Sequence, residues 1–142
     1  MQQDCEMLNR IRKSTQMGQV GIHAVMKGDL NTEFHKVLKQ QLEEYDEINK
    51  QADSLLKIHG GTPENISPLA KWGNAMATKM KHKADGSTSK IAEMMVEGNT
   101  KGMIKSMQAI RSLGVLDPKV SALSNRLLQT EQANIDQMKK YL

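Results

Sequence analysis

The chain contains 142 residues, of which 38% are hydrophobic, and it carries 20 Lys and Arg against 16 Asp and Glu. No apolar run approaches the roughly 18–20 residues that a membrane-spanning helix needs, and a single cysteine, Cys5, excludes an internal disulfide or a thiolate zinc site. Residues 1–9 include Asp4 and Glu6 and lack the apolar stretch of a secretory signal, so we expect a cytoplasmic protein with no membrane partner.

The composition favours helices over strands. The chain has 11 Met residues, but its aromatic residues are only one Trp, two Tyr and one Phe. Met is unbranched and favours helices, whereas β-branched and aromatic residues dominate strands. We therefore expect an all-α protein whose methionines fill gaps in the core. Copper or haem ligation by methionine would need a neighbouring Cys or a His cluster, which the sequence does not place beside them.

The first two predicted helices form an antiparallel hairpin. They span about 4–27 and 31–59, and Gly60-Gly61 with Pro63 ends the second. Each has apolar residues every three or four positions, which is the spacing of a buried helix face. The two faces are Leu8, Ile11, Thr15, Gly18, Ile22 and Val25, and then Phe34, Leu38, Gln41, Tyr45, Ile48, Ala52 and Leu55. Because the turn between the helices is short, they must run side by side in opposite directions.

Three more helices are expected in the rest of the chain, and the whole of 1–142 is interpreted as one domain. A shorter helix over about 68–83 starts at Ser67-Pro68 and carries the chain back along the others. Helices over about 88–113 and 118–141 form a second hairpin, separated by Gly114 and an Asp117-Pro118 start. Their predicted inner faces are Ala92, Val96, Met103, Met107 and Ile110, and then Val120, Leu123, Leu127, Glu131, Asn134, Met138 and Tyr141.

Two short-turn hairpins joined by a long crossover are the arrangement of one class of four-helix bundle. In its helix lengths, its two short turns and its crossover, the chain resembles the ferritin-like superfamily, in its small bacterial branch. The resemblance implies a four-helix bundle around a di-iron or di-manganese site. In that family, helices one and three each supply a carboxylate, and helices two and four each supply a Glu-x-x-His pair.

The resemblance implies four candidate metal ligands, and counting along the hairpins places them at one level of the bundle: Glu44, Glu97, Glu131 and Asn134. The pattern is incomplete, because Asn134 and Glu47 occupy the two His positions and the first helix has no carboxylate at this level. The missing imidazoles are the usual nitrogen donors to iron and manganese.

A second interpretation of the same residues involves no metal. Glu44 and Glu97 would then face solvent, and the carboxyl of Glu131 would be hydrogen-bonded to Gln41, Thr100 or Asn134.

The leading hypothesis for function is a non-catalytic bundle that serves as an interaction or structural module and holds no cofactor. Its partner would be another protein or a second copy of the chain, since Met94, Met95 and Trp72 lie outside the predicted inner faces and allow a dimer. The alternative is a metal-binding oxidoreductase or metal-storage relative that holds iron or manganese. Nucleic-acid binding is disfavoured, because neither terminus has a basic tail or a dense Lys/Arg stripe.

Overall fold

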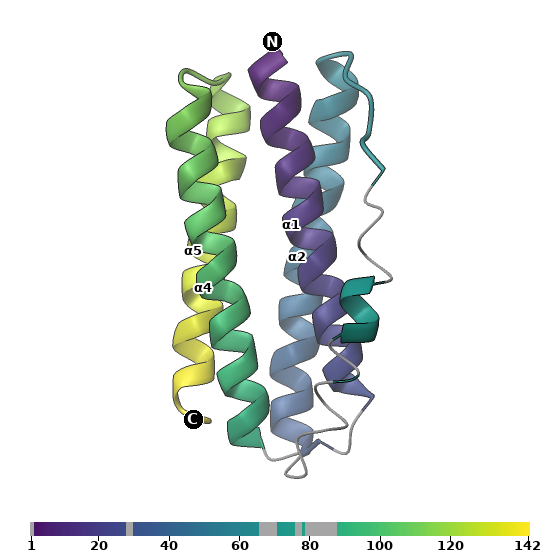
Figure 1. The fold of residues 1–142 in the computed structure, drawn as a ribbon, viewed down its shortest axis with the longest axis vertical. Helices are drawn as coiled ribbons and strands as arrows, with labels where there is room; N and C mark the ends of the chain where they lie inside the picture. The colour runs from purple at the N-terminus through teal and green to yellow at the C-terminus, as the bar shows by residue number, and fades with distance from the viewer. Residues whose placement is uncertain (1, 28–29, 66–70, 76–77, 79–87) are drawn as a thin grey trace.

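The structure, a computed structural model, describes residues 2–27, 30–65, 71–75, 78 and 88–142 (Figure 1). Its long helices are α1 (Gln2–Met26), α2 (Thr32–Ile58), α4 (Thr88–Leu113) and α5 (Pro118–Lys139). Residues 71–75 are also helical, and the described part of the chain contains no strand. The prediction of an all-α protein is confirmed. None of these helices combines the length and the apolar character that crossing a bilayer requires.

The helix ends lie within about two residues of the positions expected from capping signals. Asn31 precedes α2, and its side chain accepts a hydrogen bond of 2.8 Å from the backbone N–H of Phe34. Asp117 precedes α5 and accepts from the N–H of Lys119, with Pro118 as the first helical residue. Gly114 follows α4 with φ of +76°, a left-handed conformation that favours glycine.

The described part of the connection from α2 to α4, residues 59–65 and 71–75, runs back along the outside of α1 (Figure 1). Near its start, Asn9 of α1 donates to the carbonyl of Thr62 and accepts from the N–H of Glu64. Further along, the indole N–H of Trp72 donates to the carbonyl of Met17 at 3.0 Å. Since the contacts advance along α1 as the chain advances, this segment descends beside α1, and α2 and α4 run in the same direction (Figure 1). Ser67, which was expected to cap the 68–83 helix, and parts of that helix, including Pro68, Met76 and Met80, lie outside the described residues.

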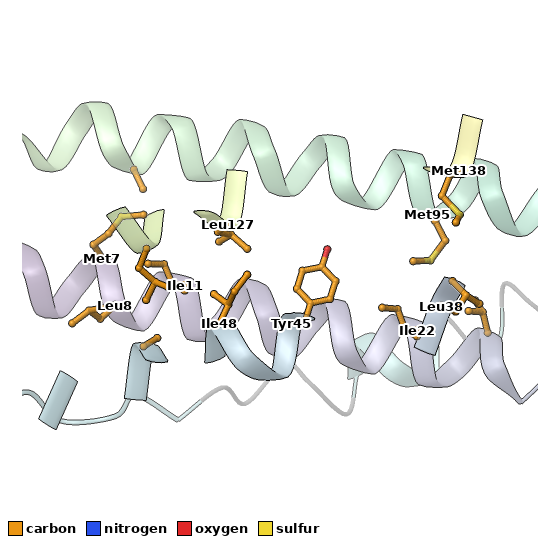
Figure 2. Packing of buried hydrophobic residues seen from close by; sticks show 14 of the residues in the cluster. Met7, Leu8, Ile11, Ile22, Leu38, Tyr45, Ile48, Met95, Leu127 and Met138 are labelled. Carbon is orange, nitrogen blue, oxygen red and sulfur yellow. The ribbon is translucent and has the colours of Figure 1, made fainter. Parts of the chain in front are cut away.

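The core follows the predicted faces of α1, α2 and α5. Apolar side chains from all four long helices meet along the axis of the bundle (Figure 2). The fully enclosed ones include Leu8, Ile11, Ile22, Phe34, Leu38, Ile48, Leu127 and Met138. On α5, Leu123, Leu127, Glu131, Asn134 and Met138 are all buried, as the spacing predicts.

The predicted inner face of α4 is correct only in part, since Ala92 is buried and Val96 and Ile110 pack against the core, but other positions differ. Met107 is 48% exposed, whereas Met94 and Met95, which were expected to lie outside, are buried. The buried side of α4 also carries small and polar residues, among them Asn99, Ser106 and Ala109. Because the polar residues among them interrupt the apolar spacing, an apolar stripe did not mark the whole of this face. Met94 and Met95 are therefore not available for the dimer surface that the sequence suggested.

Replacement of Trp72 tests the peripheral course of the connection. Because Trp72 is only half-buried and lies against the outside of α1, Trp72→Ala is expected to lose less than the roughly 3–5 kcal/mol typical of a fully buried Trp. Urea unfolding followed by circular dichroism measures this, with Trp72→Phe as a control that keeps a ring but loses the hydrogen bond to Met17. Loss of most helical signal in Trp72→Ala would contradict the arrangement.

Candidate functional site

Two glycines admit large polar side chains into the middle of the bundle. An ideal Cβ at Gly18 of α1 would lie 2.9 Å from Cε2 of Tyr45, which reaches in from α2. An ideal Cβ at Gly102 of α4 would lie 2.8 Å from Oε2 of Glu131, which reaches in from α5. Real Cβ atoms do not approach other heavy atoms so closely. In each hairpin, therefore, a glycine on one helix makes the space that the polar side chain of the other helix occupies.

Tyr45 joins the two hairpins through a buried hydrogen-bond cluster. Its hydroxyl donates to Oδ1 of Asn99 on α4 at 2.7 Å, and it accepts from Nδ2 of Asn134 on α5 at 3.4 Å. Asn99 in turn donates to the carbonyl of Met95. Figure 2 shows the hydroxyl pointing from α2 toward the second hairpin. Burial raises the pKa of Tyr45, and the nearby Glu131 carboxyl raises it further, so the phenol stays protonated and continues to donate.

Glu131 is buried without a hydrogen-bond partner. The residue is 2% exposed, and neither carboxyl oxygen accepts a hydrogen bond in the described structure. Burial raises the pKa of this carboxyl to about 8, and the neighbouring Ser14 hydroxyl of α1, which lies outside hydrogen-bonding geometry, offsets the shift only in part. Around neutral pH the group is therefore mostly a neutral acid, with an unused donor and an unused acceptor.

Glu131 lies at the floor of a groove of about 290 Å³ between α1 and α4. Both walls are largely apolar and rich in methionine. They also contain four glycines, which have no side chains to fill the groove: Gly18, Gly21, Gly98 and Gly102. The apolar lining consists of Met7, Ile11, Met17, Trp72, Met94, Met95 and Ala109. A polar group at the bottom of a mostly apolar groove is typical of a small-molecule site.

The rim of the groove is basic. Lys13 on α1 faces Lys101 and Lys105 on α4 across the opening, and all three are exposed. None of them forms an ion pair within the described part of the chain. Arg10 also lines the groove but pairs with Glu6 outside it. Glu97 is the acidic residue on the rim, so positive charge prevails there.

A second depression, of about 540 Å³, lies between α2 and α5 and is bordered by Glu47, Lys50, Lys119 and Arg126. It is wide and shallow, and none of the buried polar atoms that lack a partner belongs to its lining. Glu47 and Arg126 already pair with each other at 3.0 Å. The groove between α1 and α4 is therefore the candidate site.

The four candidate metal ligands differ in burial and do not form a cluster of acidic ligands in the described structure. Glu131 and Asn134 are buried on the inner face of α5, whereas Glu97 is exposed at the groove rim. Glu44 is half-buried, and its pKa is raised overall. Burial is the largest cause; Arg126 lowers the pKa in part, and Glu47 raises it. Within the part of the chain that the structure describes, no three His, Cys, Asp or Glu residues converge as a metal site.

The donor set also fails to match the family pattern around Glu131 itself. The α1 side chain beside it is Ser14, and the α4 residue against it is Gly102. Neither supplies a carboxylate, and Asn134 already donates to Tyr45. The residues that surround this acid do not fit a di-iron or di-manganese centre.

The hydrogen bonds predicted for Glu131 are not formed. The amide of Gln41 donates to Gln137, and the hydroxyl of Thr100 donates to the carbonyl of Val96 on its own helix. Asn134 is taken by Tyr45. The inward position of Glu131 is confirmed, but its carboxyl lies against Gly102 and the groove instead of these partners.

Apolar periodicity and the metal-ligand pattern did not identify Gly98, Gly102 or the lysines of the groove as site residues. A usable signal was present, since two glycines spaced by four on one predicted helix indicate a close approach by another element. Comparison of the chain with protein-family models, with curated proteins and with solved structures gives no match.

The stability of the protein should fall as the pH rises from 4.5 to about 8. The pKa of Glu131 is about 8 in the folded chain and 4.5 in the unfolded chain, so in this window the folded state binds more protons. At about 1.4 kcal/mol per pKa unit, this group accounts for a loss on the order of 4 kcal/mol. Glu131→Gln should remove that part of the slope and be the more stable chain at pH 8, as measured by urea unfolding.

Glu97→Gln is the matched control, because Glu97 is an exposed acid on the same groove. It should leave the pH dependence unchanged. Parallel stability profiles for the parent chain and Glu131→Gln would show that Glu131 is not a buried, unpaired acid.

Proposed function

We propose that the protein is a non-catalytic binding module that holds a small organic molecule in the groove between α1 and α4. The observation that carries this proposal is Glu131, a buried carboxyl with two unpartnered oxygens at the groove floor. An unsatisfied buried polar group costs about 1–3 kcal/mol, which a bound ligand with matching polar atoms would recover. A ligand that hydrogen-bonds to Glu131 removes this cost, and the free energy so recovered adds to its affinity.

The groove lining supports binding without chemistry. It includes Ser14, Ser106 and Tyr45 but no His and no Cys, so the described lining holds no Ser–His or Cys–His pair that would generate a nucleophile. The hydroxyl of Tyr45 is engaged with Asn99 and Asn134. These features favour a module that binds its ligand unchanged.

We further propose that the bundle is ferritin-like in topology. The parallel course of α2 and α4 and the connection along α1 support this proposal. The alternative function, an iron- or manganese-dependent oxidoreductase or storage protein, has one supporting feature, the buried Glu131 carboxyl. Among the described residues, the carboxylates and imidazoles that usually accompany such an acid in a metal site do not gather around it.

Occlusion of the groove tests the proposed binding function. An ideal Cβ at Gly98 meets no atom within 4 Å, so Gly98→Leu should place a side chain in the groove without disturbing the core. The parent chain should bind the apolar anion 8-anilinonaphthalene-1-sulfonate at one saturable site, and Gly98→Leu should weaken binding at least about tenfold. Fluorescence titration and calorimetry measure both.

The matched control is Gln108→Leu, which adds the same side chain at an exposed position of α4 outside the groove. It should bind the probe as the parent chain does. Absence of saturable binding, or equal binding by Gly98→Leu, would refute a ligand site in this groove.

Metal content tests the alternative. Protein purified without an affinity tag or added metal should contain well under one iron or manganese per chain by elemental analysis, because the donors around Glu131 do not complete a site. Stoichiometric metal that is lost in Glu131→Gln would favour the oxidoreductase or storage function instead.

A further inference from the structure

The groove has lysines at its opening and a carboxyl group at its floor, and this arrangement limits the chemistry of its ligand. Gly102 lies against the Glu131 carboxyl, and Ser14 neighbours it from α1. Lys101 and Lys13 adjoin these two residues in the chain, so both lysines lie on the rim at the level of the buried acid. The groove therefore presents positive charge at its opening and, below it, a carboxyl group that lacks partners.

A ligand cation does not suit this arrangement. To reach Glu131 it would pass between Lys13 and Lys101, with Lys105 one helical turn further along the same side of the rim. Glu97 is the acid that lines the rim against these three lysines. An anionic group at the opening is favoured by the same charges.

The Glu131 carboxyl at the floor of the groove favours a ligand with a hydroxyl group. Both oxygens of Glu131 lack a partner, whereas the nearby Tyr45 hydroxyl and Asn99 amide bond to each other. A ligand hydroxyl can accept from the O–H of the neutral acid and donate to its carbonyl oxygen, so one group satisfies both atoms. The lysines and the acid share one level, so this hydroxyl must lie close to the anionic group of the ligand.

The walls on either side of this level suit an aliphatic chain. Met7 and Ile11 line the groove toward the start of α1, and Met17 and Trp72 line it in the other direction. Methionine side chains are flexible and adapt to an unbranched chain.

We propose that the ligand is an aliphatic carboxylate that carries a hydroxyl group close to its carboxylate, with the carboxylate between the lysines, the hydroxyl on Glu131 and the chain along the methionine-lined walls. This inference rests on the proposed function of the groove and specifies its ligand.

Calorimetric titration with decanoate, 3-hydroxydecanoate, 10-hydroxydecanoate and decylamine tests the inference. We expect 3-hydroxydecanoate to bind about tenfold more tightly than decanoate, the gain that one additional buried hydrogen-bonding group provides. The distant hydroxyl of 10-hydroxydecanoate should give no such gain, and decylamine should bind most weakly.

Two substitutions of Glu131 test whether this residue causes the preference for 3-hydroxydecanoate. Glu131→Met keeps the length of the side chain but removes its hydrogen-bonding atoms, so it should abolish the preference for 3-hydroxydecanoate over decanoate. Glu131→Gln retains a donor and an acceptor and should preserve that preference.

Variants of the rim test the carboxylate position. Replacement of Lys13, Lys101 and Lys105 together by Met should weaken both fatty acids at least about tenfold. The charge-matched control replaces Lys36, Lys39 and Lys57 by Met, which are exposed on α2 and outside the groove, and it should have little effect.

If the ligands bind, any of three outcomes would overturn the inference: tightest binding by decylamine, equal binding of decanoate and 3-hydroxydecanoate, or a preference that survives in Glu131→Met. Failure of every fatty acid to bind would also overturn it. If the anilinonaphthalene probe still bound to the parent chain and not to Gly98→Leu, the groove would remain a binding site for another ligand class. Loss of probe binding as well would refute the proposed function itself.

Discussion

A carboxyl group loses several kcal/mol of hydration when it enters a protein interior without partners, and proteins rarely retain such a group unless it has a role. Glu131 of α5 is in this position because Gly102 of α4 leaves the space that it fills. A Cβ at residue 102 would displace the carboxyl end of the Glu131 side chain from its present position. The packing of that hairpin and the shape of the groove therefore depend on the same pair of residues.

The first hairpin has a matching arrangement, in which Tyr45 fills the space left by Gly18, but its polar group is satisfied. The hydroxyl of Tyr45 bonds to Asn99 and thereby ties α2 to α4 across the bundle. One polar side chain thus fastens the two hairpins together, and the other is left available beside the groove. The hydroxyl of Tyr45 therefore has a structural role, whereas the carboxyl of Glu131 remains free to bond to a ligand.

Much of the fold could be predicted from the sequence, because helix caps and apolar spacing are local signals. The full face of α4 could not, since its buried side includes Asn99 and Ser106, which are polar and do not continue the apolar periodicity. The inward position of Glu131 followed from the spacing on α5. Its lack of partners depends on residues of α1 and α4, whose positions only the tertiary structure fixes.

The protonation state of Glu131 is the most direct test of the account. Carbon-13 NMR of the side-chain carboxyls, titrated between pH 3 and pH 10 and assigned with Glu131→Gln, measures its pKa in the folded protein. We expect a pKa of about 8, raised by burial without a compensating partner. A pKa close to 4.5, the ordinary value, would show that the carboxyl is hydrated or paired, and the groove would then lack the unpartnered acid that defines it.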